Sequence, residues 1–227
     1  MHKLQYFTLF IIIALSSACG NSKTASSESD TTATKTVSAQ ATNTKTILFF
    51  GDSLTAGYGL EDPQSEAFPA LVQGKIDSLK LPYKIVNGGL SGETSAGGKG
   101  RIDWLLRQKV DIFILELGAN DGLRGLQTDE TAKNLQAIVD KVKTKYPNAK
   151  LILTGMMVPP NMGADYANAF KAIFPGIAKK NNMVFLPFLL TNVAGIKDLN
   201  QADGIHPTAK GAKIVADNVW GVLKGEL

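Results

Sequence analysis

The sequence predicts an α/β fold, a three-layer α/β/α sandwich around a five-stranded parallel sheet. Three observations predict it. Five short apolar runs are each followed by a turn that is rich in glycine or polar residues. Segments with helical apolar spacing lie between those runs. The chain of 227 residues is 44% hydrophobic and 19% charged, which is typical of one globular domain with short appendages.

Each apolar run has the length of a buried strand and ends at a turn signal. The strands of a parallel sheet are covered by helices on both faces, so we expect continuous apolar runs rather than alternation. The run DIFILEL at 111–117 is the strongest of the five. The predicted strands are residues 46–50, 84–87, 111–117, 151–154 and 184–186.

Helices are expected between and after these strands, because apolar residues recur there at three- and four-residue spacing. Pro69 is tolerated only in a first turn, Thr128 is expected as an N-cap, and Pro175 predicts a break or bend. The strict alternation of strand and helix predicts a flavodoxin-like arrangement. The predicted helices cover residues 68–79, 101–108, 128–145, 167–181 and 208–223.

Charge and residue counts exclude several function classes. The 24 basic and 20 acidic residues leave a net charge of +4, which is too small and too scattered to indicate a nucleic-acid partner. A single cysteine excludes an internal disulfide and a thiolate zinc cluster. Of the two histidines, His2 lies at the extreme N-terminus, so imidazole chemistry in the folded body falls to His206.

The N-terminal region predicts export and an anchor. Lys3, an apolar run at 9–15 and small residues at 16–18 are typical of a signal peptide, and the run is too short to span a membrane. Cys19 follows Ser-Ser-Ala, which resembles a bacterial lipobox; a plain signal peptide with an incidental cysteine is the alternative. We therefore predict a lipoprotein signal peptide at 1–18, lipidation of Cys19, a disordered Ser/Thr-rich tether within 19–45, and one domain at 46–227.

In an open parallel sheet, sites form beyond the carboxyl ends of the strands. Ser53 follows the first predicted strand, and Asp203 and His206 follow the fifth. A base activates a serine by taking its proton, and an aspartate orients that base, so these three residues form a candidate catalytic set. Each residue alone has a plainer interpretation: Ser53 as a helix N-cap, Asp203 as part of a turn, and His206 as a surface loop residue.

The same loops contain candidate donors for the oxyanion that forms when a serine attacks an ester. The backbone N–H groups of Ser53 and Gly92 and the side-chain amide of Asn120 are the natural set. Gly92 lets its N–H approach a ligand closely because it has no Cβ. Taken alone, Asn120 is more simply interpreted as a turn residue. The joint placement of all these residues at strand ends favours acyl-transfer chemistry.

Four motifs resemble blocks I, II, III and V of the GDSL or SGNH hydrolases: GDSLTAGYG at 51–59, SGET at 91–94, GAND at 118–121 and DGIHP at 203–207. The similarity is greatest to the branch of thioesterase I, lysophospholipase L1 and arylesterase. It implies Ser53, Asp203 and His206 as the triad, and Ser53, Gly92 and Asn120 as the oxyanion hole. It also implies that a mobile loop at 121–127 lines the acyl groove, with Asp121, Gly122 and Leu123 as substrate-binding residues.

Two apolar segments near the strand ends are expected either to pack in the core or to line the site. The stretch MMVPP at 156–160 follows the fourth strand and either forms a wall for an acyl chain or simply packs; as a wall, it would make Pro159 a substrate-binding residue. Phe185, Phe188 and Leu189 are expected in the core.

These observations predict a monomeric, membrane-anchored serine esterase that acts on lysophospholipids, thioesters or aryl esters. Serine and imidazole suffice for that reaction, so no metal or organic cofactor is expected. The resemblance and the lipobox place the protein in the bacterial cell envelope, as a periplasm-facing or outer-membrane lipoprotein. A carbohydrate O-deacetylase of the same family and a non-catalytic binding lipoprotein are the alternatives.

Overall fold

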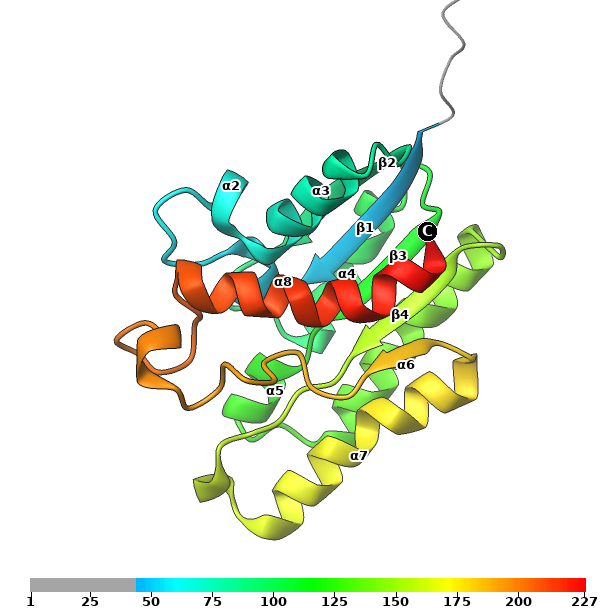
Figure 1. Cartoon of the computed structure of the whole chain (residues 1–227). Helices are drawn as coiled ribbons and strands as arrows, with labels where there is room; N and C mark the ends of the chain where they lie inside the picture. The colour runs from blue at the N-terminus through cyan, green and yellow to red at the C-terminus, as the bar shows by residue number, and fades with distance from the viewer. Residues whose placement is uncertain (1–43) are drawn as a thin grey trace, which may run out of the picture. The chain divides into compact units, whose positions relative to one another are not determined.

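The computed structural model describes residues 44–227, and the predicted signal peptide, Cys19 and nearly all of the predicted tether lie outside them. Five parallel strands form one sheet in the order β2-β1-β3-β4-β5 (Figure 1). The prediction of a five-stranded parallel sheet is therefore confirmed. The strands are β1 Lys45–Gly51, β2 Tyr83–Gly89, β3 Ile112–Glu116, β4 Lys150–Thr154 and β5 Val184–Leu186.

Helices cover both faces of this sheet and complete the three layers (Figure 1). Helices α3 and α8 pack against each other in one layer, while α4, α6 and α7 pack in sequence in the other. The α-helices are α1 Ser53–Ala56, α2 Pro63–Glu66, α3 Phe68–Ser78, α4 Ser95–Leu105, α5 Ala119–Leu123, α6 Thr128–Lys145, α7 Ala164–Asn181 and α8 Ala209–Leu223. Three short 3₁₀ helices are η1 Pro160–Met162, η2 Lys197–Leu199 and η3 Lys224–Glu226.

Helix α4 begins six residues earlier than the sequence predicts, at Ser95. The Thr94 side chain accepts a hydrogen bond from the Gly97 N–H at 3.3 Å and caps the helix. Three glycines at 97, 98 and 100 lower the helix propensity of this stretch and conceal it in the sequence. Gly98 is needed for packing, because a Cβ there would lie 2.5 Å from Leu117 Cδ1.

Two further helix predictions are corrected. The N-cap of α6 is Gln127 rather than Thr128, and its side chain makes no capping bond. Helix α7 starts at Ala164 and continues through Pro175, so the helix does not break there. Pro175 lies on the exposed face, where water can bond the carbonyl left without a donor, while Phe170 and Phe174 on the other face are buried. Packing of that apolar face therefore outweighs the lost hydrogen bond.

The described residues 44–227 lie in one compact unit, which contains all five strands and the hydrophobic core described between Ile47 and Leu223. None of the helices that the structure describes is both long and apolar enough to cross a membrane. No group of three or more His, Cys, Asp or Glu side chains in the described part of the chain is arranged to hold a metal ion.

Candidate active site

Ser53 is the first residue of α1, directly after β1 and at the carboxyl edge of the sheet. The Asp52 carboxylate caps this short helix by accepting a hydrogen bond from the Leu54 N–H at 3.0 Å. Gly57 ends the helix with a φ of 77°, in the left-handed region that glycine adopts without strain. The tight turn that results holds the Ser53 hydroxyl at the carboxyl end of β1.

A continuous chain of hydrogen bonds joins the three predicted triad residues. Ser53 Oγ lies 2.8 Å from His206 Nε2, and His206 Nδ1 lies 2.6 Å from Asp203 Oδ2. The other Asp203 oxygen accepts from the Ile205 and His206 N–H groups at 2.9 and 3.1 Å. Burial opposes ionisation of Asp203, but the bonds from His206 and the two N–H groups outweigh it and lower its pKa to about 2. The carboxylate is thus charged and fixed in the orientation that a base partner needs.

The loop that carries this pair is braced against the loop after β1. Gln201 Nε2 donates to the Tyr58 carbonyl at 2.7 Å and to the Pro207 carbonyl at 2.9 Å. The Tyr58 ring also lies 4.7 Å from the His206 ring. These contacts join two segments that are far apart in the sequence and hold the imidazole over Ser53.

The predicted oxyanion donors lie around the same point. Within residues 44–227, neither the Ser53 N–H nor the Gly92 N–H donates to a protein acceptor. Gly92 has a φ of 78° and no atom within 4 Å of the position a Cβ would take, so the space on that side of its backbone is open. Asn120 Nδ2 donates to Asp52 Oδ2 at 3.2 Å and to the Glu93 carbonyl at 3.1 Å. Both amide hydrogens thus have acceptors, and an oxyanion would have to share one of them.

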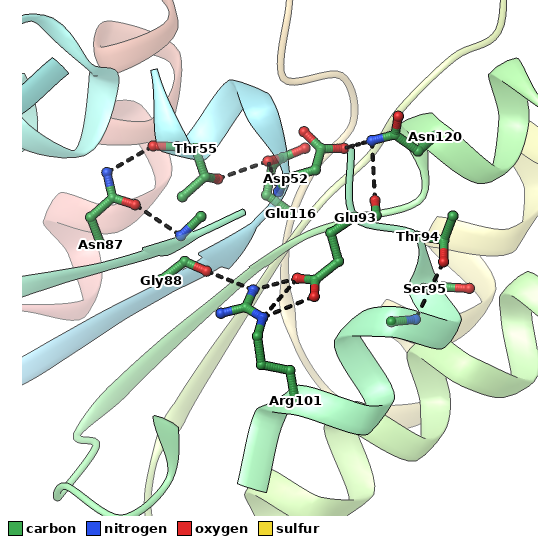
Figure 2. A network of polar contacts seen from close by, with 12 residues as sticks. Asp52, Thr55, Asn87, Gly88, Glu93, Thr94, Ser95, Arg101, Glu116 and Asn120 are labelled. Carbon is green, nitrogen blue, oxygen red and sulfur yellow. Dashed lines mark hydrogen bonds and ion pairs between the residues drawn. The ribbon is translucent and has the colours of Figure 1, made fainter. Parts of the chain in front are cut away.

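Asp52, the residue before Ser53, and Glu116 form a buried carboxyl pair (Figure 2). Glu116 Oε2 accepts from the Asp52 N–H at 3.2 Å and from Thr55 Oγ1 at 2.7 Å. Burial raises the pKa of Asp52 to about 6, against the opposing effects of the Leu54 N–H, His206 and Asn120. Burial and the nearby Asp52 charge raise the pKa of Glu116 well above its usual range. Both effects favour the protonated form of Glu116 in the folded protein.

A second pair holds the loop that contains Gly92 (Figure 2). The Arg101 guanidinium binds both oxygens of the buried Glu93 carboxylate, with Nε 2.9 Å from Oε1, and also donates to the Gly88 carbonyl at 2.9 Å. The same guanidinium lies over the Phe50 ring, 4.6 Å from its centre. Because the Glu93 carbonyl accepts from Asn120, this ion pair positions two of the three candidate oxyanion donors.

A cavity of about 790 Å³ lies against Ser53 and His206. Its lining includes the whole MMVPP stretch at 156–160, so this stretch lines the cavity as well as packing. Phe188, predicted as core, also lines it, whereas Leu189 is fully buried and Phe185 packs half-buried against the core. The large apolar lining residues include Leu54, Leu123, Met156, Met157, Val158, Pro159, Pro160, Phe188, Leu190 and Ile205.

The predicted substrate-binding set is partly corrected. Leu123 and Pro159 line the cavity, but Asp121 and Gly122 do not. The buried Asp121 carboxylate accepts from the Ser95 N–H at 2.8 Å and from Thr131 Oγ1 at 3.2 Å, so it ties α5 to α4 and α6. Gly122 packs against α7, where a Cβ would lie 2.9 Å from the Phe170 ring.

Four residues of the site were not singled out from the sequence: Asp52, Glu93, Arg101 and Glu116. For Glu116 a signal was present, because it is the one acidic side chain near the end of an otherwise apolar strand run. Such a residue must be paired or neutral when it is buried. Nothing in the sequence indicates that Arg101 and Glu93 form a pair, since they lie on a helix and a preceding loop.

Comparison with known proteins identifies relatives over most of the described chain. Residues 49–214 match the sequence model of the GDSL-like Lipase/Acylhydrolase family. Esterase TesA of Pseudomonas aeruginosa is 37% identical over 79% of this chain and 88% of its own length. Thioesterase 1/protease 1/lysophospholipase L1 of Escherichia coli K12 is 40% identical over 76% of this chain and 80% of its own. The crystal structure of the psychrotrophic esterase EstA of Pseudoalteromonas, inhibited by monoethylphosphonate, matches 80% of this chain and 98% of its own at a TM-score of 0.75 and 37% identity.

Proposed function

Because the chain belongs to the GDSL-like lipase/acylhydrolase family, we propose that it is a membrane-anchored serine esterase that cleaves lipid acyl esters through an acyl-enzyme on Ser53. One observation carries the proposal: the Ser53–His206–Asp203 hydrogen-bond chain lies against a large apolar cavity. Acyl groups are the ligands that such a lining accepts, and the volume lies in the range of pockets that hold whole small molecules.

In the proposed first half-reaction, Ser53 Oγ attacks the ester carbonyl carbon while its proton passes to His206 Nε2. The carbonyl oxygen becomes an oxyanion and accepts hydrogen bonds from the Ser53 and Gly92 N–H groups, together with the shared Asn120 amide. When the tetrahedral intermediate collapses, the bond to the leaving oxygen or sulfur breaks. The leaving group takes the proton from Nε2, and the acyl group stays on Ser53.

In the second half-reaction, water attacks the acyl carbon and its proton passes to the same His206 nitrogen. Collapse of the second intermediate breaks the bond to Ser53 Oγ, which recovers the proton, and the carboxylic acid leaves. Asp203 stabilises the imidazolium in both half-reactions and, with a pKa of about 2, stays ionised throughout.

Hydrolysis of para-nitrophenyl esters from acetate to palmitate tests the reaction and the substrate class. We expect kcat/KM to rise from acetate to a medium or long acyl chain, because the added methylenes enter the apolar cavity. A maximum at acetate would instead support a carbohydrate O-deacetylase. No turnover of any ester would contradict the proposal and support a binding lipoprotein.

Anchoring is a separate part of the proposal and rests on Cys19, the only cysteine, directly after a small-residue cleavage site. We expect a palmitate analogue to label the full chain in a bacterial host and Cys19→Ser to abolish the labelling. The variant should also leave the membrane fraction and keep its ester hydrolysis. Equal labelling of both chains would contradict the lipid anchor without affecting the esterase assignment.

A further inference from the structure

Exposed large apolar side chains gather at the end of the domain that carries the site. Between residues 44 and 227 nine large hydrophobic side chains are exposed. Seven of them follow the carboxyl ends of the strands, and we call these seven the apolar rim. The other two, Leu79 and Trp104, lie at the C-terminal ends of α3 and α4, which lead back to the opposite edge of the sheet (Figure 1). The rim consists of Tyr58, Leu90, Leu123, Leu126, Met157, Ile196 and Ile205.

The rim is continuous with the mouth of the cavity. Tyr58, Leu123, Met157 and Ile205 are exposed to solvent and also line the cavity. Leu90 and Ile196 are each directly next to a lining residue in the chain, Ser91 and Gly195 respectively. Single exposed apolar residues are ordinary on a protein surface, but a group around one opening marks an interaction site.

We propose that the apolar rim docks on a lipid surface, so that an acyl chain passes from the lipid into the cavity without crossing water. This inference rests on the proposed esterase function and adds the surface through which the substrate enters. An apolar rim around an apolar cavity fits a hydrocarbon phase better than a polar partner, because both surfaces lose contact with water together.

The length of chain between Cys19 and the described residues allows the rim to face the membrane. Strand β1 begins at Lys45, at the edge of the sheet opposite the rim, and its seven residues rise only about 23 Å. The chain between Cys19 and Thr44 can span at most about 85 Å. A lipid on Cys19 would therefore leave enough chain for the rim to reach the same membrane.

Binding to phosphatidylcholine vesicles tests the proposal. The described residues 44–227 lie in one compact unit that holds the whole described core, so a protein that begins at Thr44 can be tested without Cys19. Leu90→Ser, Leu126→Ser and Ile196→Ser together change rim residues that do not line the cavity. We expect the triple variant to lose about tenfold or more in vesicle partitioning. Hydrolysis of soluble para-nitrophenyl butyrate should stay within about twofold of the unsubstituted protein.

The matched control replaces the two exposed apolar residues outside the rim, Leu79→Ser with Trp104→Ser, and should keep the vesicle partitioning. Equal partitioning of all three proteins, or an equal loss in the control, would overturn the proposal. So would a dimer of the unsubstituted protein that dissociates in the rim variant and does not bind vesicles, because a second copy would then cover the rim. Failure of butyrate hydrolysis in every protein would contradict the esterase function instead, and vesicle partitioning would still be measured separately.

Discussion

Replacing Arg101 with methionine is expected to lower kcat far more than it changes KM, although Arg101 does not touch the cavity. Methionine is an unbranched apolar side chain, and it removes the guanidinium that lies over the Phe50 ring. The Glu93 carboxylate then loses its cation, and the Gly88 carbonyl loses a donor. The loop that carries Gly92 and the Glu93 carbonyl is no longer held against α4, so the Asn120 amide loses a fixed acceptor.

The expected losses in stability and in kcat follow from the burial of the Arg101–Glu93 pair. The Glu93 side chain is only 3% exposed and that of Arg101 22%, so the variant leaves a buried carboxylate without a partner. Breaking such a pair costs about 3 kcal/mol or more of unfolding free energy. For a domain of this size that corresponds to a fall in Tm of about 6–12 °C. A well-placed oxyanion donor contributes about 10²–10³ in kcat, so partial misplacement should cost roughly 10–100-fold.

Steady-state kinetics with one chromogenic ester, well below the Tm of each variant, measures the effect on catalysis. The double variant Glu93→Gln with Arg101→Met removes the unpaired charge and should recover much of the Tm while kcat stays low. Asp103→Asn is the matched control on the same helix, because it breaks the exposed ion pair with Lys141 at 2.7 Å. This variant should change neither Tm nor kcat. Arg101→Met with a lowered Tm and an unchanged kcat would refute the positioning role.

Three further outcomes are expected. Ser53→Ala should lose about 10³-fold or more in kcat with an unchanged Tm, and mass spectrometry should find a phosphonate adduct on the 51–54 peptide of the unsubstituted protein alone. Asn120→Asp should lower kcat at least as much as Asn120→Ala at nearly constant KM, whereas near-normal kcat in the aspartate variant would make Asn120 a simple turn residue. Because burial raises the pKa of Glu116, the folded protein keeps a proton that the unfolded chain releases near pH 4.5, and its stability falls as pH rises above that value. The Tm of Glu116→Gln relative to the unsubstituted protein should therefore increase from pH 4.5 to 7.5, and a difference independent of pH would contradict the raised pKa of Glu116.

The fold class and the positions of the principal strands follow from local sequence patterns. Strands buried on both faces are apolar along most of their length, so β1 and β3 can be recognised in the sequence as apolar runs that end in polar turns. Parallel strands place their following loops at one edge, and this rule alone brought Ser53 and His206 to the same region. Their contact at 2.8 Å is a matter of side-chain placement that spacing in the chain does not contain.

The roles of the polar residues beside those motifs depend on how the layers pack. Asp121 is adjacent to Asn120 in the chain, yet its carboxylate points to Ser95 and Thr131 in the protein interior. Arg101, Glu93 and Glu116 act through partners on other elements, so their roles depend on how α4, β1 and β3 pack. The grouping of the apolar rim likewise depends on loops from all five strands meeting at one edge. The pattern of apolar residues in a segment predicts how that segment is buried. Contacts between residues far apart in the sequence form only when the layers of the fold pack together.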